Sequence, residues 1–468
     1  MTQRRLPEEL GGYAARPVAR FHMPGHKGRG MGGFFRPELI GWDVTELSFS
    51  DNLHDPKGGI SNAQQAYAKT VQAAHTFFLI NGSTAGIHAL LHYIRPNSRV
   101  LAGRDCHRAV LNGAMFARHD IRYVAPALHE DYNLFGCVTP EALEESLKRE
   151  RADVVFITSP NYYGVCADIK GIHEVVKKHG ALLFVDAAHG AHFSFSDALP
   201  ASPAGYADAW VESAHKTLNA LGQAALLHAE KGMDIARLQR VLSMIETSSP
   251  SYLLLASLDW ARYTAGLFSA WTKCANDVEK LENEIKKDML GLKIIEKSIR
   301  GCAGIFDKDV TRLVIDVHER GITGYEAMEA LEKRDVYIEM ADLQRLVLIC
   351  TPADDKKWYS LLLEALQALP YGKKAFRPVR LERNMEHEQA VALSEVFERE
   401  TRACPLKNAA GKIAGAPVGV YPPGIPCFAP GERIRKDDVD YLLLQQSAGA
   451  VLFGVQEGSI SILGRGKR

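Results

Sequence analysis

The chain has 468 residues, more than a single hydrophobic core usually serves, so we expect two or more domains. Hydrophobic residues make up 46% and charged residues 24%, which is ordinary for a globular protein. The formal net charge is zero, with 56 basic and 56 acidic residues. This balance argues against general binding of nucleic acid, which needs a large basic surface, so recognition must depend on local charge.

Neither the cysteines nor the apolar segments indicate export or a membrane span. The eight cysteines are scattered, contain no CxxC pair and match neither a secreted disulfide framework nor a zinc site. The N-terminal stretch lacks the apolar core of a signal peptide, and no apolar run approaches the roughly twenty residues that a membrane span requires. We therefore expect a cytoplasmic protein with reduced cysteines and no membrane partner.

From about residue 70 to residue 230, short apolar runs alternate with helical patterns. Two of the intervals, 141–149 and 172–179, have the periodicity of amphipathic helices. Buried strands that alternate with helices predict an α/β fold with a mostly parallel sheet covered on both faces. The runs that we interpret as strands are residues 76–80, 99–102, 121–125, 154–158, 182–186, 209–213 and 224–228.

Smaller units follow this region. Residues 231–300 look largely helical, and residues 310–370 mix strand-like runs with a helical pattern at 325–334. The last segment contains a rigid, non-helical run of prolines and glycine at 421–426. We therefore divide the chain into an N-terminal segment 1–70, a large domain 71–300, a small α+β domain 301–370 and a C-terminal domain 371–468.

The most informative motif is Ser213-Ala214-His215-Lys216, at the end of an apolar run. A lysine directly after such a strand is where a Schiff base to an aldehyde cofactor would be built. Asp186 ends an earlier strand, and a buried acid needs a partner such as the protonated nitrogen of a pyridine ring. Together they suggest pyridoxal phosphate (PLP). The alternatives are a solvated Lys216 and an Asp186 that caps a helix or forms a structural ion pair.

Other polar side chains follow the same set of strands, and ligands of parallel sheets bind at the carboxyl ends of strands. Ser83 and Thr84 open a helix, where amide groups and hydroxyls can bind phosphate; plain helix capping is the alternative. His107 could lie flat on a pyridine ring, or it could be a structural histidine. The predicted cofactor site comprises Ser83, Thr84, His107, Asp186, His189, Ser213, His215 and Lys216.

Two further patterns indicate little. The run at 28–33 contains GxGxxG, but a dinucleotide site needs a preceding strand, and Pro24 and Gly25 lie there instead. His189 and His192 are three residues apart, but no other ligands at zinc-like spacing support a metal site. The chain also lacks the GxSxG and HExxH patterns of serine hydrolases and zinc proteases. We predict no metal.

The ordered motifs resemble the bacterial ornithine/lysine/arginine decarboxylases, PLP enzymes with the aspartate-aminotransferase fold (fold type I). The resemblance covers nearly the whole chain, and the length resembles the short Gram-positive-type members without an N-terminal wing domain. It rests on Phe21-His22-Met23-Pro24-Gly25-His26-Lys27, Asp43-Val44-Thr45-Glu46-Leu47, Asp51-Asn52-Leu53-His54, Asn81-Gly82-Ser83-Thr84, Asp186-Ala187-Ala188-His189-Gly190-Ala191-His192, Ser213-Ala214-His215-Lys216-Thr217 and Tyr421-Pro422-Pro423-Gly424-Ile425-Pro426.

The resemblance implies a role for each matched position. Lys216 would bind PLP, Asp186 would pair with the ring nitrogen and His107 would stack on the ring. Lys216 or His215 would return a proton to the substrate after CO2 leaves. Glu432 would lie near the distal cation of the substrate. Segment 1–70 would contribute to the active site and to a homodimer or higher homo-oligomer with shared sites. Weaker candidates for the distal acid are Asp43, Glu46 and Asp51.

The implied reaction is decarboxylation of a basic L-amino acid to a polyamine-pathway amine. One methylene in a pocket discriminates by only about 1–3 kcal/mol, so lysine and ornithine stay possible. We favour arginine because short relatives with this C-terminal segment include biosynthetic arginine decarboxylases. Asn408 stands where an acid is common, which leaves recognition of the distal group open. The alternatives are another type I PLP enzyme, such as an aminotransferase or aldolase, and a non-catalytic PLP-binding homologue.

Overall fold

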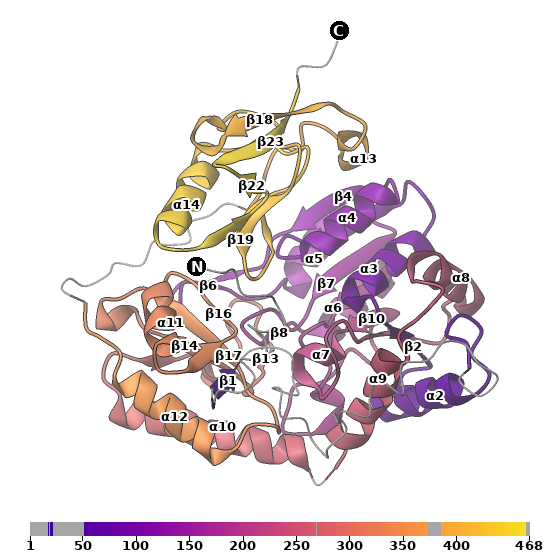
Figure 1. Ribbon diagram of the computed structural model, residues 1–468. Coiled ribbons are helices and arrows are strands. Elements are labelled where there is room, and N and C mark those ends of the chain that lie inside the picture. The colour runs from indigo at the N-terminus through magenta and orange to yellow at the C-terminus, as the bar shows by residue number, and fades with distance from the viewer. Residues whose placement is uncertain (1–16, 18, 22–50, 268, 373–384, 465–468) are drawn as a thin grey trace, which may run out of the picture.

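A seven-stranded sheet forms the centre of the computed structural model, which describes residues 17, 19–21, 51–267, 269–372 and 385–464 (Figure 1). Its strand order is β2-β11-β10-β9-β7-β3-β4, and β11 alone runs antiparallel to its neighbours. This confirms the predicted α/β fold. The strands are β2 (His75–Leu79), β3 (Arg99–Gly103), β4 (Asp120–Val124), β7 (Val154–Thr158), β9 (Leu182–Asp186), β10 (Ala209–Glu212) and β11 (Ala225–Ala229).

Helices cover the sheet because the segments between the strands are amphipathic. In α5, Leu143 and Leu147 are buried one turn apart, and Ile172 and Val176 repeat this spacing in α6. The side chain of Thr139 caps the first turn of α5. The helices around this sheet are α2 (Gly59–Val71), α3 (Gly82–Tyr93), α4 (Arg108–Phe116), α5 (Pro140–Arg149), α6 (Ile169–Lys178), α8 (Ile235–Ile245) and α9 (Tyr252–Ala265).

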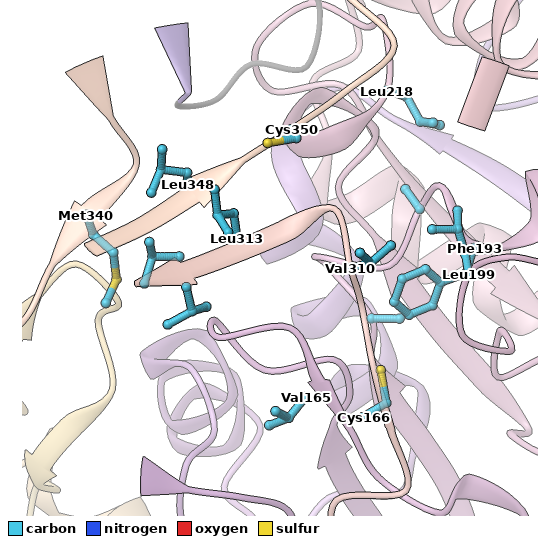
Figure 2. Packing of buried hydrophobic residues seen from close by; sticks show 14 of the residues in the cluster. Val165, Cys166, Phe193, Leu199, Leu218, Val310, Leu313, Met340, Leu348 and Cys350 are labelled. Carbon is cyan, nitrogen blue, oxygen red and sulfur yellow. The ribbon is translucent and has the colours of Figure 1, made fainter. Parts of the chain in front are cut away.

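A second, four-stranded sheet lies beside the large one, in the order β12-β14-β17-β16. It joins the large domain through β13 (Asp307–Lys308), which pairs with β8 (Val165–Cys166). Figure 2 shows Val310 and Leu313 from this side in one hydrophobic cluster with Phe193 and Leu199 of the large domain. The elements of this part are β12 (Lys293–Ile294), β14 (Arg312–Asp316), β15 (Val336–Ile338), β16 (Met340–Ala341), β17 (Arg345–Ile349), α10 (Ala270–Asp288), α11 (Gly324–Glu332) and α12 (Lys356–Gln367).

The C-terminal part has its own core of apolar side chains, among them Val418, Phe428 and Leu442. Two three-stranded sheets and α14 (Lys436–Ser447) enclose this core, and these elements lie at the top of Figure 1. The strands are β18 (Thr401–Pro405), β19 (Val418–Tyr421), β20 (Pro426–Phe428), β21 (Val451–Phe453), β22 (Val455–Gln456) and β23 (Ser459–Leu463). None of the helices in the described part of the chain is both long and apolar enough to cross a membrane.

Helix α3 packs very closely on the large sheet at Gly86. A Cβ atom at this position would lie 2.7 Å from Cγ1 of Val211 and 2.8 Å from Cδ1 of Leu79. These two side chains belong to β10 and β2, so the close approach places the N-terminus of α3 beside the carboxyl ends of both strands.

We therefore predict that Gly86→Val destabilises the protein by about 1–3 kcal/mol, because the added atoms overpack this interface. The measurement is the urea midpoint of the large domain's unfolding transition. Gly59→Ala is the matched control, since a Cβ at that exposed position meets nothing within 4 Å. Equal midpoints for Gly86→Val and wild type would contradict the packing described here.

Candidate active site

The predicted site residues come together at one edge of the large sheet. Strands β2, β3, β9 and β10 run in the same direction, so the residues that follow them meet at their carboxyl ends. Two hydrogen bonds link these strand ends. The Ser213 hydroxyl donates to Oγ of Ser83 at 2.8 Å, and Nζ of Lys216 lies 2.9 Å from Nε2 of His189.

Lys216 lies in the one-turn helix α7 (Ala214–Thr217) that follows β10, and its side chain is half-buried. Burial lowers the pKa of its amine to about 8, and the positive charge of Arg312 acts in the same direction. The carboxylates of Asp186 and Glu339 raise the pKa and oppose these effects. A substantial fraction of the amine is therefore neutral near physiological pH, as a nucleophilic lysine requires.

Asp186 is a buried carboxyl group at the end of β9. One oxygen accepts a 3.1 Å hydrogen bond from the backbone N–H of Ala188. Burial raises the pKa of the carboxyl group, and the nearby Lys216 lowers it. Within the described residues, Asp186 forms no ion pair with a basic side chain. A buried acid of this kind fits a ligand that brings a protonated ring nitrogen.

The N-terminus of α3 fits a phosphate group. Its N-cap residue, Asn81, makes no capping hydrogen bond with its side chain, although the first amide, that of Gly82, donates to the backbone oxygen of Gln223 at 2.8 Å. The hydroxyls of Ser83 and Ser213 meet beside it, and Thr84 is exposed on the first turn. Amide groups and hydroxyls at a helix N-terminus attract an anion.

His107 has the structural role that the sequence left open as an alternative. Its Nδ1 accepts a 3.2 Å hydrogen bond from the N–H of Ala109, so it caps α4. Burial, followed by the positive charges of Lys216 and Arg108, lowers the pKa of its ring to about 4. His107 is therefore a neutral ring near Lys216, whose charge contributes to the lowered pKa. A neutral aromatic ring in this position suits stacking on an aromatic cofactor.

His215 is also neutral. Its Nδ1 lies 2.9 Å from the backbone oxygen of Ala224 and donates to it, and burial lowers the pKa of the ring to about 4. A ring with such a pKa holds no extra proton at neutral pH. Of the two residues predicted to return a proton to the substrate, the structure therefore favours Lys216.

The two histidines of the His189–His192 motif have different partners. His189 contacts Lys216, whereas Nε2 of His192 lies 3.1 Å from a carboxylate oxygen of Asp309 and 3.1 Å from the hydroxyl of Thr311. They do not form a shared metal pair. No group of three or more histidine, cysteine or acidic side chains within the described ranges could hold a metal ion.

Three residues that the sequence did not single out also surround Lys216. The ring of Tyr162 lies 4.4 Å from that of His189, and its hydroxyl donates to Glu339 at 2.8 Å. Arg312 donates to Nδ1 of His189 at 3.2 Å. Tyr162 follows β7, so the strand-end argument could have found it. Arg312 and Glu339 come from the small sheet's part of the chain, where no local motif marks them.

Glu432, predicted to contact the distal cation of the substrate, has partners within the chain. Its carboxylate is 1% exposed, forms a 2.9 Å ion pair with Arg104 and accepts the backbone N–H of Ala429 at 2.7 Å. Arg104 also donates to two backbone oxygens of β20, at Pro426 and Cys427. A carboxylate enclosed in this way is not open to a substrate cation. Through its ion pair with Arg104, Glu432 links the C-terminal part to the large domain.

Asp51, one of the weaker acidic candidates, also has partners within the chain. The carboxylate of Asp51 accepts backbone N–H groups of Asn52, Lys57, Gly58, Ile60 and Ser61. These hydrogen bonds lower its pKa to about 2 although burial opposes them, and they commit the carboxylate to the start of α2. Asp43, Glu46 and the glycine run at 28–33 lie outside the described residues.

We predict that Arg104→Met destabilises the protein by about 3–5 kcal/mol, because it leaves the buried Glu432 carboxylate without the guanidinium that pairs with it at 2.9 Å. Urea unfolding measures the loss, and the double variant Arg104→Met/Glu432→Leu should recover part of it. If Glu432→Gln keeps normal stability but no longer binds basic amino acids, Glu432 contacts the substrate after all.

The turn between β19 and β20 covers His107. Gly424 has a left-handed backbone (φ +80°), and its carbonyl accepts the N–H of Arg108 at 3.4 Å. A Cβ at Gly424 would lie 3.3 Å from Nε2 of His107. The C-terminal part therefore completes one wall of the site.

Gly424→Ala should weaken cofactor binding several-fold, because the left-handed backbone costs about 1–2 kcal/mol for alanine and the methyl group presses on His107. An absorbance titration with PLP gives the dissociation constant. Gly411→Ala is the matched control, since Gly411 has a similar φ (+78°) and a Cβ there meets nothing within 4 Å. Equal losses in both variants would show that backbone strain alone acts.

Comparison with known proteins gives a consistent family. The family model "Orn/Lys/Arg decarboxylase, major domain" matches residues 6–301, and the model of the C-terminal domain of that family matches residues 371–457. Arginine decarboxylase of Bacillus anthracis is 33% identical to this chain, over 96% of this chain and 94% of its own. Arginine decarboxylase of Bacillus subtilis is 31% identical, over 99% and 98%.

Solved structures agree on the fold. Lysine decarboxylase A from Pseudomonas aeruginosa superposes with a TM-score of 0.78 at 20% identity, covering 97% of this chain and 80% of that one. A serine palmitoyltransferase from S. paucimobilis with bound PLP–myriocin aldimine has a TM-score of 0.55 at 16% identity, covering 75% and 86%. These likenesses confirm the type I fold of PLP enzymes. The two family models, with relatives at 31–33% identity over nearly the whole chain, show that the chain belongs to the Orn/Lys/Arg decarboxylase family.

Proposed function

We propose that the protein decarboxylates L-arginine with the help of PLP and releases CO2 and the corresponding amine. The observation that carries this proposal is the half-buried Lys216 beside the buried Asp186, at the strand ends of a type I fold. The choice of arginine is supported by the likeness to arginine decarboxylases over nearly the whole chain.

The described residues fit PLP group by group. Lys216 would hold the aldehyde carbon, Asp186 would keep the ring nitrogen protonated and His107 would lie against the ring. The N-terminus of α3, which has no side-chain cap, would hold the phosphate together with Ser83, Thr84 and Ser213. Bound in this way, PLP supplies an electron sink for the pair of electrons that the departing carboxylate leaves on Cα.

The surrounding side chains control the proton. Lys216, whose pKa is about 8, can take up a proton and return it to Cα. His215 stays neutral and hydrogen-bonded to the backbone, so it orients the loop instead of carrying charge. Tyr162 lies against His189 and the turn at Gly424 lies against His107, so both would cover part of the bound cofactor.

The proposal extends to the protein's setting. All eight cysteines are unpaired and seven are buried, which supports a reducing cytoplasm. The zero net charge supports a small-molecule substrate without a nucleic-acid partner. Family resemblance supports a homodimer or higher homo-oligomer with shared sites and a place in polyamine biosynthesis.

The test incubates the purified protein and PLP separately with arginine, lysine and ornithine, and measures CO2 and amine. We expect release from arginine above the other two, and no release from Lys216→Ala, which should also lose the cofactor's absorbance band. Lys436→Ala is the control, because its side chain is 77% exposed. Release of CO2 from lysine or ornithine alone would contradict the choice of arginine as substrate. Conversion of PLP to its amine form without release of CO2 would indicate an aminotransferase.

A further inference from the structure

His189 is a buried histidine between two side chains that are usually cationic. Its Nε2 lies 2.9 Å from Nζ of Lys216, and its Nδ1 lies 3.2 Å from Nη2 of Arg312. Only 5% of His189 and 1% of Arg312 are exposed. Water therefore does little to screen the three groups from one another, and the hydrogen bonds between them must have compatible donors and acceptors.

Arg312 decides the direction of both hydrogen bonds. A guanidinium group has N–H donors and no acceptor, so Nδ1 of His189 must accept from it. Burial and the charges of Lys216 and Arg312 lower the pKa of the His189 ring well below its usual value, so the ring is neutral. A neutral imidazole that accepts at Nδ1 carries its single proton on Nε2.

The Nε2–H group of His189 then points at the amine of Lys216. A protonated amine has only donors, so it would place its own N–H against the N–H of His189 without forming a hydrogen bond. A neutral amine has a lone pair and can accept the hydrogen bond from His189. We propose that Arg312 fixes the tautomer of His189, and that His189 in turn holds the Lys216 amine in its neutral, nucleophilic form. This inference rests on the proposed role of Lys216 and makes His189 and Arg312 positioning residues for cofactor attachment.

The side chain of Arg312 is held in position to donate to His189. Its Cβ and Cγ pack against the backbone at Gly164, where an added Cβ would lie 2.6 Å from Cβ of Arg312. Its Nε and Nη1 are buried and have no hydrogen-bond partner among the described residues. Within the described part of the chain, the hydrogen bond that the guanidinium of Arg312 makes is therefore the one from Nη2 to His189.

Other groups around Lys216 act in the opposite sense or are neutral. The carboxylates of Asp186 and Glu339 favour the protonated amine, as does the face of the Tyr162 ring, whose centre lies 5.9 Å from Nζ. His107 and His215 are neutral near pH 7. Burial and the charge of Arg312 oppose protonation without any directed bond, so the Arg312–His189 chain is the directional contact that favours the neutral amine.

The consequence is a pH dependence of cofactor attachment. An aldehyde reacts with the neutral amine, so the rate of attachment should rise with pH and level off above the pKa of Lys216, which is about 8. If the chain of hydrogen bonds is broken, the amine keeps its proton to higher pH. An upward shift of one unit in the midpoint makes attachment about tenfold slower at pH 7.

The experiment follows, by absorbance, the rate at which PLP attaches to cofactor-free protein. The pH runs from roughly 6 to 10, a range that brackets the pKa of an active-site lysine. His189→Phe removes both hydrogen bonds without changing a charge, and the expected midpoint shift is about one unit upward. His189→Gln should restore most of the wild-type midpoint, because its amide can accept from Arg312 and donate to Lys216 at once. His179→Phe, a histidine paired with Glu144 away from the site, is the control and should not shift.

Arg312→Met supplies the second, independent variant. It should also raise the midpoint, and adding His189→Phe to it should shift the midpoint by less than the sum of the two single changes. An unchanged midpoint in His189→Phe, or full additivity in the double variant, overturns the inference and leaves only the charge of Arg312 acting. These results differ from failure of the proposed function, in which the wild-type protein attaches no PLP at Lys216.

Discussion

The shared direction of four strands in the large sheet is the constraint on which the site depends. Strands β2, β3, β9 and β10 all end at one edge, and each contributes the residues that follow it. Ser83, His107, Asp186 and Lys216 lie far apart along the chain, yet this topology brings them together. Gly86 strengthens the constraint, because only a residue without a side chain lets α3 lie so close to the strands.

Burial then sets the charge of each group at this edge. It lowers the pKa of Lys216, His107 and His215 and raises that of Asp186, so the site favours neutral bases around an acid that needs a positive partner. Such a set of groups suits a cofactor that brings its own protonated nitrogen and its own phosphate. In our proposal, the hydrogen bonds from Arg312 to His189 and from His189 to Lys216 further favour the neutral form of the Lys216 amine.

Local sequence patterns were sufficient for the sheet and for most of the site. The apolar runs located all seven strands to within about a residue, because buried parallel strands are continuous and apolar. Lys216, Asp186 and Ser83 followed from their positions after these strands. Arg312 and Glu339 could not be found in this way, because they reach the site from another part of the chain. The ion pair of Glu432 could not be predicted either, because its partner, Arg104, is 328 residues away in sequence.

The most direct measurement reduces the PLP-treated protein with borohydride and maps the modified peptide by mass spectrometry. The account predicts that the cofactor is fixed to Lys216, that Lys216→Ala carries none, and that Lys436→Ala is modified like wild type. Modification at another lysine, or none in the wild-type protein, would contradict the central claim that this strand end is built to hold PLP.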